Sequence, residues 1–468
     1  MESTTNTVED QLIDGLQFRL PAGASYITDR KSVSFFPHGG NDYKPSGVKV
    51  IKFVLTGNDW LDPSTVKFQF QVNNTATPGA LIALPNGVNT MRPILLPLSG
   101  PFCFFRRMRV LCQGQTIEDI DIYNRVHNMF HRLSAKHVKD NEAVEGFEWT
   151  VDDDLFDPNI SISAVNTTGQ MVLNWMNNPK PTGLGANESK IVSFKPLAGI
   201  LNQSKLLPLK VAPLTFEFEL VGTPDEAVAH GIDNLEANDP FLTGNVSKEW
   251  SLSDVQMKCD LLTLDNGLDN EYTQHLLQGK ALSINYSTFI SSMQVIAGAV
   301  SSVNISRSVS RLKSIFVTYD GYHAADSFGF FKEVNDMYHP MKGYRYDAKK
   351  ELEYQIQIGS KLFPVYPVRS LAEAFSQLKK TLGIQQTNFH SIDINMKQYM
   401  HNHFIIACDT EKQLSAGFTG LNTKNGDLIT IKTKSMSGIP ADHPTRIYVT
   451  LHSDNVLNIR DSGVDVLD

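Results

Sequence analysis

Two histidines in the last fifth of the chain come nearest to the spacing of a metal site. His401 and His403 flank Asn402, and Glu411 follows eight residues after the second histidine. A cupin-like site needs a glutamate much closer to the second histidine, so that one strand and its turn bring all three ligands together. The longer spacing favours two half-exposed histidines beside a strand over a metal ligand set.

Clustered carboxylates and thiols are the other candidates for chemistry. Asp152–Asp154 and Asp157 are oxygen ligands of the kind that Ca²⁺ prefers, but they lack the alternation and the turn glycine of an EF-hand loop. A solvated acidic turn fits them better. Cys103 and Cys112 lie in apolar strand contexts without a histidine motif beside them, so small core residues are the favoured interpretation over a disulfide or a nucleophile.

Motifs that bind phosphate or activate a serine are missing from the sequence. It contains no GxGxxG, no GxxxxGK[ST] and no G-x-S-x-G pattern. We therefore predict that the protein is not an enzyme, that it has no catalytic, cofactor-binding or metal-binding residues and no cofactor or small-molecule substrate, and that its role is structural.

Charge and composition narrow the class of protein further. The formal net charge is -8 over 468 residues, and the densest basic cluster, Arg106, Arg107 and Arg109, is small, which argues against neutralising nucleic-acid phosphate as the main task. The four cysteines suit a reducing compartment. The acidic N-terminus has no apolar core of a signal peptide, and no apolar run is long enough to span a membrane, so we expect synthesis in the cytosol.

One unit occurs twice in the sequence. It consists of a strand, a glycine turn, a second strand and a helix, and much of the chain is organised around its two copies. In residues 109–133, Gly114 is followed by Phe130 and Leu133, and in residues 354–378, Gly359 is followed by Phe375 and Leu378 at the same offsets. Glycine suits the turn because it takes positive φ without a Cβ penalty. The second helix also carries a capping box, Ser370 with Glu373. The spacing predicts a duplicated unit, with chance similarity as the alternative.

Apolar and polar residues alternate in several segments, which predicts antiparallel sheets with one face on a core. The clearest such segments are 48–55, 67–72, 214–220, 352–358 and 447–452. Long polar insertions separate them at 134–205, 222–250, 320–350 and 409–426. A helix is expected at 268–276, with Gly279 as its left-handed stop.

The repeat and the composition predict three parts. Residues 1–45 are turn-rich and are expected to form an extended arm that lies on a neighbour or stays disordered. Residues 46–245 form a first domain and residues 246–468 a second, with the segment from 250 as the first strand of the second domain. The outer faces of the two repeated helices, Arg125, Asn128 and His131 in one and Glu373, Gln377 and Lys380 in the other, are expected to be free for neighbours.

The order of these motifs resembles the double jelly-roll major capsid proteins of Polinton-like viruses, adintoviruses and virophages. The similar segments are residues 98–133, 206–221, 255–282, 356–383, 418–434 and 457–468. The resemblance implies an all-β chain of two tandem eight-stranded antiparallel jelly rolls with short flanking helices and long loops.

The resemblance also implies a function. Three chains would form a homotrimeric, pseudo-hexameric capsomer that tiles the icosahedral shell of a DNA virus, which places the protein in the virion. Implied partners are neighbouring capsomers, penton and minor capsid proteins, and packaged DNA or an internal membrane at the inner face. The alternative is a cupin-like or carbohydrate-binding β-sandwich protein, resting on His401, His403 and the acidic run. A minor spike protein is disfavoured, because it would not carry the duplication.

Overall fold

A computed structural model describes most of the chain. The described residues are 26–83, 89–147, 160–165, 171–175, 183–229, 242–296, 300–320, 337, 339–340, 351–384, 392–400, 403–411, 420–435 and 446–468. No helix within them is long and apolar enough to cross a membrane.

Alternating side chains build the sheets as predicted. In β12 (Leu214–Leu220) and β17 (Leu352–Ile358), every second residue is buried. The same pattern runs through the centre of β3 (Trp60–Asn74). Each of these strands pairs with its neighbours in antiparallel fashion. In such sheets the apolar face packs on the core while the polar face meets solvent.

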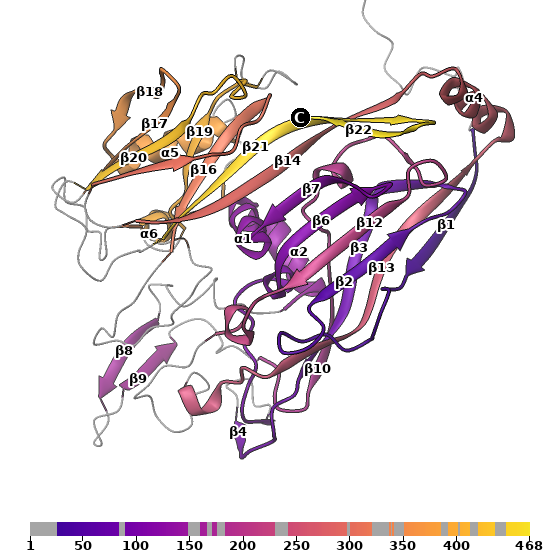
Figure 1. Cartoon of the computed structure of the whole chain (residues 1–468). Coiled ribbons are helices and arrows are strands. Elements are labelled where there is room, and N and C mark those ends of the chain that lie inside the picture. The colour runs from indigo at the N-terminus through magenta and orange to yellow at the C-terminus, as the bar shows by residue number, and fades with distance from the viewer. Residues whose placement is uncertain are drawn as a thin grey trace, which may run out of the picture.

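Two sheets form the first half of the molecule (Figure 1). The larger sheet, which we call sheet A1, has the order β1 (Ile27–Phe35), β13 (Trp250–Leu264), β3 and β10 (Ser189–Phe194), with β11 (Leu207–Pro208) also on β3. Facing it, sheet B1 has the order β2 (Val50–Leu55), β12, β6 (Phe105–Cys112) and β7 (Gln115–Asp121). Phe68 of sheet A1 lies at the centre of the core, and its ring stacks on that of Phe218 of sheet B1 at 4.5 Å.

The second half repeats this arrangement. Sheet A2 has the order β14 (Leu282–Val295), β21 (Arg446–Arg460), β16 (Leu312–Tyr319) and β19 (Ile406–Asp409), with β22 (Gly463–Leu467) paired to β21. Sheet B2 has the order β15 (Val300–Ile305), β20 (Ile429–Ser435), β17 and β18 (Lys361–Val368). Each half has eight strands on the main paths of its two sheets. When these eight strands are numbered in chain order, both halves have the same sheet order, which is that of an eight-stranded jelly roll.

The repeated unit recognised in the sequence occupies the same place in each jelly roll. Gly114 joins β6 to β7 and Gly359 joins β17 to β18, with φ of 86° and 57°. The helices α1 (Tyr123–Leu133) and α5 (Leu371–Thr381) follow directly. The serine half of the predicted capping box of α5 is confirmed, because the Ser370 side chain accepts a hydrogen bond from the Glu373 backbone N–H at 3.2 Å. The Glu373 side chain accepts from the Arg369 backbone N–H at 3.4 Å.

Smaller elements complete the description. The helix α4 (Asn266–Leu277) joins the two jelly rolls and confirms the predicted helix, with Gly279 at a φ of 76°. The others are α2 (Lys136–Glu145), α6 (Met396–Met400), β4 (Leu81–Ala83), β5 (Asn89–Met91), β8 (Ile160–Val165), β9 (Met171–Trp175) and the 3-10 turns η2 (Pro101–Phe104), η3 (Gly199–Leu201), η4 (Pro224–Glu226) and η5 (Thr243–Asn245).

Strand pairing bears on three expectations about the chain's division. The segment from 250 does not open the second unit, because β13 pairs with both β1 and β3 inside sheet A1. Strand pairing therefore favours a division after Leu264, in place of the predicted division at 245/246, and the domain limits stay a prediction.

In the expected arm, residues 27–35 form β1, which lies on β13 of its own chain, while residues 1–25 lie outside the described residues. The insertion at 134–205 also holds a core strand, β10.

The two turn glycines give a matched test of the repeat. An added Cβ at Gly114 meets open space, whereas at Gly359 it would lie 2.2 Å from Asp427 Oδ1. We expect Gly114→Ala to lower the free energy of unfolding by about 1 kcal/mol, the cost of positive φ alone. Gly359→Ala should cost about 1 to 3 kcal/mol more, and Asp427→Ala should remove that excess. Urea unfolding of the purified chain measures all three, and equal costs at the two glycines would contradict the contact.

Candidate assembly interfaces

The helix α1 lies between the two jelly rolls and not on the outside of the molecule (Figure 1). Arg125 and Asn128, which we expected on a free outer face, are 2% and 1% exposed. His131 faces α2, with its Nε2 3.2 Å from Glu142 Oε2. The prediction of a free face is therefore wrong for α1. Its buried side packs on the outer face of sheet A2, which belongs to the second half.

Arg125 is the polar centre of this junction. Its Nε donates to Thr318 Oγ1 at 3.2 Å and its Nη2 donates to the Tyr319 carbonyl oxygen at 2.7 Å. The guanidinium also stacks over the Tyr448 ring, 3.9 Å from its centroid. A buried cation is tolerated only when its donors are satisfied, and the flat guanidinium can do this while also stacking on an aromatic face. The contact therefore fixes α1 on sheet A2 in one orientation.

An aromatic seam continues the junction. Phe130 of α1 lies with its ring centroid 4.8 Å from that of Phe289 on β14 and 5.3 Å from that of Phe316 on β16. Phe289 in turn stacks on His452 of β21 at 5.0 Å. Aromatic rings at these separations bury large apolar areas with defined geometry. The seam ties α1 to three neighbouring strands of sheet A2.

A close backbone approach marks the edge of the junction, where β7 and η3 meet β14. A Cβ added at Gly199 would lie 1.4 Å from the Ser287 carbonyl oxygen, so only glycine fits there. Tyr286 donates its hydroxyl to the Ile117 carbonyl oxygen at 2.8 Å. Backbone and side chains of both halves thus interlock along the edge strand β7.

Glu118 is a buried carboxylate at this same edge. It accepts hydrogen bonds from the backbone N–H groups of Gly199 at 2.8 Å and Ile200 at 2.7 Å. Burial raises the pKa of Glu118 from its ordinary 4.5 to about 7, while these hydrogen bonds and that of Thr288 oppose the rise. The junction therefore contains an acid that can bind a proton near neutral pH.

The histidine and glutamate of the possible metal site are not brought together. His403 precedes β19 and is buried, with its Nδ1 3.5 Å from Arg132 Nη1 of α1. Glu411 follows β19 and lies 3.6 Å from Lys313 Nζ. His401 and the run Asp152–Asp157 lie outside the described residues. Among the residues that the structure describes, no group of three or more potential ligands could hold a metal ion.

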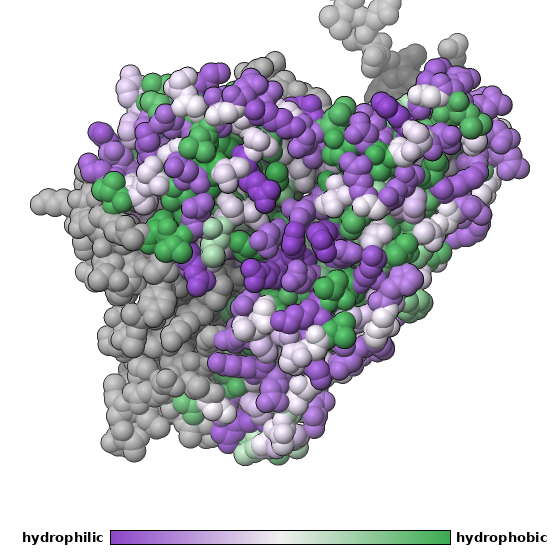
Figure 2. All heavy atoms as spheres, in the orientation of Figure 1, coloured by the Kyte–Doolittle hydropathy of each residue, from purple (hydrophilic) through white to green (hydrophobic). Residues whose placement is uncertain are grey.

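The cysteines and the basic cluster have structural surroundings. All four cysteines are buried and none of them forms a disulfide, and burial raises the pKa of the Cys112 thiol to about 12. The basic residues form cross-strand ion pairs on the outer face of sheet B1, with Arg107 Nη2 2.6 Å from Asp119 Oδ2 and Arg109 Nη2 2.8 Å from Glu217 Oε2. Figure 2 shows a strongly hydrophilic area over this sheet.

The equivalent flank of the second jelly roll is uncovered in the single chain. On α5, Glu373 is exposed and Gln377 and Lys380 are half-buried. On the edge strand β18, Val365 and Tyr366 are 70% and 79% exposed. The two flanks therefore differ in environment although they occupy the same place in the fold.

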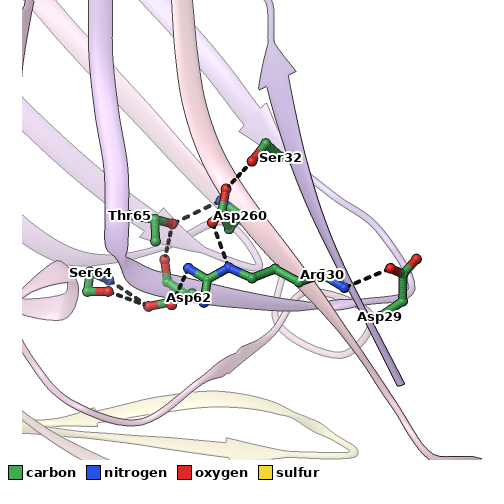
Figure 3. Close-up of polar contacts among 7 residues, drawn as sticks. All are labelled: Asp29, Arg30, Ser32, Asp62, Ser64, Thr65 and Asp260. Atoms are coloured by element: carbon green, nitrogen blue, oxygen red, sulfur yellow. Dashed lines mark hydrogen bonds and ion pairs between the residues drawn. The ribbon is translucent and has the colours of Figure 1, made fainter. Parts of the chain in front are cut away.

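The outer face of sheet A1 is also uncovered and carries a polar network (Figure 3). Arg30 on β1 bridges two strands, with its Nε donating to Asp260 Oδ2 at 2.7 Å and its Nη2 to Asp62 Oδ2 at 3.2 Å. Ser32 donates to Asp260 Oδ1 at 2.6 Å. Hydrogen bonds lower the pKa of Asp260 below its ordinary 3.8, and the bond from the Ser32 hydroxyl has a larger effect than the bond from Arg30. The network holds β1 on the sheet and leaves a charged, hydrogen-bonding surface.

Comparison by sequence finds no similar protein family, whereas comparison by structure finds similar proteins. No protein-family model matches it, and no curated protein matches it. The capsid of the virus PBCV-1 is similar over 97% of this chain and 100% of its own, with a TM-score of 0.59 and 10% identity. The Sputnik virophage structure is similar over 98% of this chain and 92% of its own, with a TM-score of 0.58 and 11% identity. The Faustovirus major capsid protein is similar over 95% of this chain and 93% of its own chain, with a TM-score of 0.53 and 9% identity.

The chain has the double jelly-roll fold of these major capsid proteins. The fold predicted from the resemblance is thereby confirmed. Because the similar region covers nearly all of both chains, the likeness includes both jelly rolls of this double jelly-roll chain and not one sandwich alone.

Removing the Arg125 side chain should destabilise the double jelly roll. Arg125→Ala leaves the Tyr319 carbonyl oxygen without this donor and opens a gap above Tyr448, so we expect the free energy of unfolding to fall by about 3 kcal/mol. The matched control is Arg369→Ala at the start of α5, whose side chain is 66% exposed and pairs with Glu353 at 2.9 Å; it should cost less than about 1 kcal/mol. Urea unfolding measures both, and similar costs would show that the junction does not depend on Arg125.

Glu118 should make stability depend on pH. Between pH 4.5 and about 7 the folded chain holds a proton on Glu118 that the unfolded chain has lost, so raising the pH through this range destabilises the fold. Glu118→Gln cannot titrate. The stability of the wild type relative to this variant should therefore fall by up to about 3 kcal/mol between pH 4 and pH 8. Urea unfolding at the two pH values tests this, and a difference that is the same at both would contradict it.

Proposed function

We propose that the chain is a viral major capsid protein, a structural protein that assembles into the icosahedral shell of a DNA virus. The observation that carries the proposal is the double jelly-roll fold, shared over 95–98% of this chain with capsid proteins of virophage and other viruses. One jelly roll would be weak support, because the same sandwich occurs in many proteins. Two jelly rolls in tandem, joined through a buried junction, are a much narrower architecture.

The proposal extends to a homotrimer. One chain contains two similar domains side by side, so three chains around a three-fold axis would place six similar jelly rolls in a ring, and a unit of this shape can tile a hexagonal lattice. Neighbouring capsomers, penton and minor capsid proteins, and packaged DNA or an internal membrane at the inner face complete the proposed partners. The protein's location is then the virion, after synthesis in the host cytosol. The proposed division has one jelly roll on each side of α4.

The proposed role needs no catalysis. The possible ligands His403 and Glu411 lie on either side of β19, and His403 contacts the junction helix α1. Buried cysteine thiols with raised pKa are poor nucleophiles. These observations do not favour the cupin-like alternative, and they fit a chain whose chemistry is that of packing and assembly.

The mass of the purified chain in solution tests the proposal. Size-exclusion chromatography with light scattering should give about three times the chain mass of 52.1 kDa. Metal analysis of the same sample, purified without chelator, should find no stoichiometric metal. A stable monomer, or one bound metal ion per chain, would count against the capsid function and favour the alternative.

A further inference from the structure

We infer that the flank of the second jelly roll formed by β18 and α5 packs on the outer face of sheet A1 of a second copy of the chain. This inference rests on the proposed trimer and names the surfaces that hold it together. It starts from a contact already present within one chain, the packing of β7 and α1 on sheet A2.

The internal contact supplies the template. In the shared strand order, β18 corresponds to β7, α5 to α1, and sheet A1 to sheet A2. The edge strand β14 of sheet A2 contacts β7, as β22 also does, and β1 is the edge strand of sheet A1 that corresponds to β14. One chain therefore contains the contact once in satisfied form and once as two separate, uncovered surfaces. A second copy is the partner that carries the complementary half of each.

The β18 surface is apolar where a soluble protein would be expected to place polar residues. Val365 and Tyr366 are mostly exposed on a strand that forms the edge of sheet B2, and Leu362 is 36% exposed beside them. Exposed apolar side chains on an edge strand invite pairing with another chain. In the first jelly roll the corresponding edge strand, β7, is covered by β14.

The receiving surface on sheet A1 is polar. Beside the Arg30 network lie Ser34 and Lys258, which are exposed and pair in register across β1 and β13. Next to them on the same face, Gln69 and Gln256 pair across β3 and β13. Tyrosine suits such a surface, because its ring supplies apolar contact and its hydroxyl a hydrogen bond. A polar receiving face also keeps the folded chain soluble before it meets a partner.

The two surfaces lie at opposite ends of the molecule, with β18 at the upper left and β1 at the right of Figure 1. A single chain cannot bring them together, so the contact is head-to-tail. A head-to-tail contact closes into a ring when its rotation divides a full turn. Repetition of the internal junction around six jelly rolls gives three chains per ring.

Two variants divide the contact into its halves. Val365→Asp with Tyr366→Asp places charges on the β18 surface, and Ser34→Glu with Lys258→Glu adds negative charge beside Asp260 on the receiving surface. All four positions are exposed, so circular dichroism spectra should match the wild type. Each variant alone should be a monomer by light scattering, a threefold loss of mass. Val144→Asp, at an 82% exposed site on α2 outside both surfaces, is the matched control and should stay trimeric.

Mixing the two variants tests the direction of the contact. Each has one intact surface, so an equimolar mixture should form a complex of two chains and no larger species. A trimeric wild type with either variant still trimeric, or a mixture that stays monomeric, would overturn the assignment of these surfaces while leaving the capsid function in place. A monomeric wild type would instead count against the proposed function itself.

Discussion

The packing of α1 on sheet A2 is the constraint on which the arrangement of the two jelly rolls depends. Arg125 donates hydrogen bonds to Thr318 and to the Tyr319 carbonyl oxygen, and its guanidinium stacks on Tyr448. Sliding or rotating one jelly roll against the other would break these contacts and leave a buried cation unsatisfied. The aromatic seam beside it adds buried apolar area with defined ring geometry. Together they hold the two similar domains in one arrangement, as the proposed capsid lattice would require.

The two cores are not independent. The first core is rich in phenylalanine around Phe68, but it also includes Ile284 and Tyr286 of β14 and Leu457 of β21. The second core includes Met129 and Leu133 of α1. Each jelly roll thus completes the core of the other, and we expect them to unfold as a coupled unit. The surfaces left over, β18 with α5 and the face of sheet A1, are those whose counterparts are buried inside the chain.

Local patterns predicted the local structure well. Alternation in 214–220 and 352–358 depends on the period of a strand, and Gly114 and Gly359 on backbone freedom, so both are visible in the sequence. The pairing of β13 with β1 is not visible, because Leu264 and Ile27 are joined only by tertiary structure. Burial of Arg125 was missed for a related reason. A helix reveals one apolar face, but a second face buried by hydrogen bonds to another domain looks like a solvated one. An arginine within the first turn of a repeated helix was the signal in the sequence.

Electron microscopy of the purified full chain would show directly how copies of the chain are arranged. We expect class averages with three-fold symmetry, a hexagonal outline and six lobes of similar size, with each pair of lobes formed by one chain. Isolated two-lobed particles, or open chains of copies that never close, would contradict it.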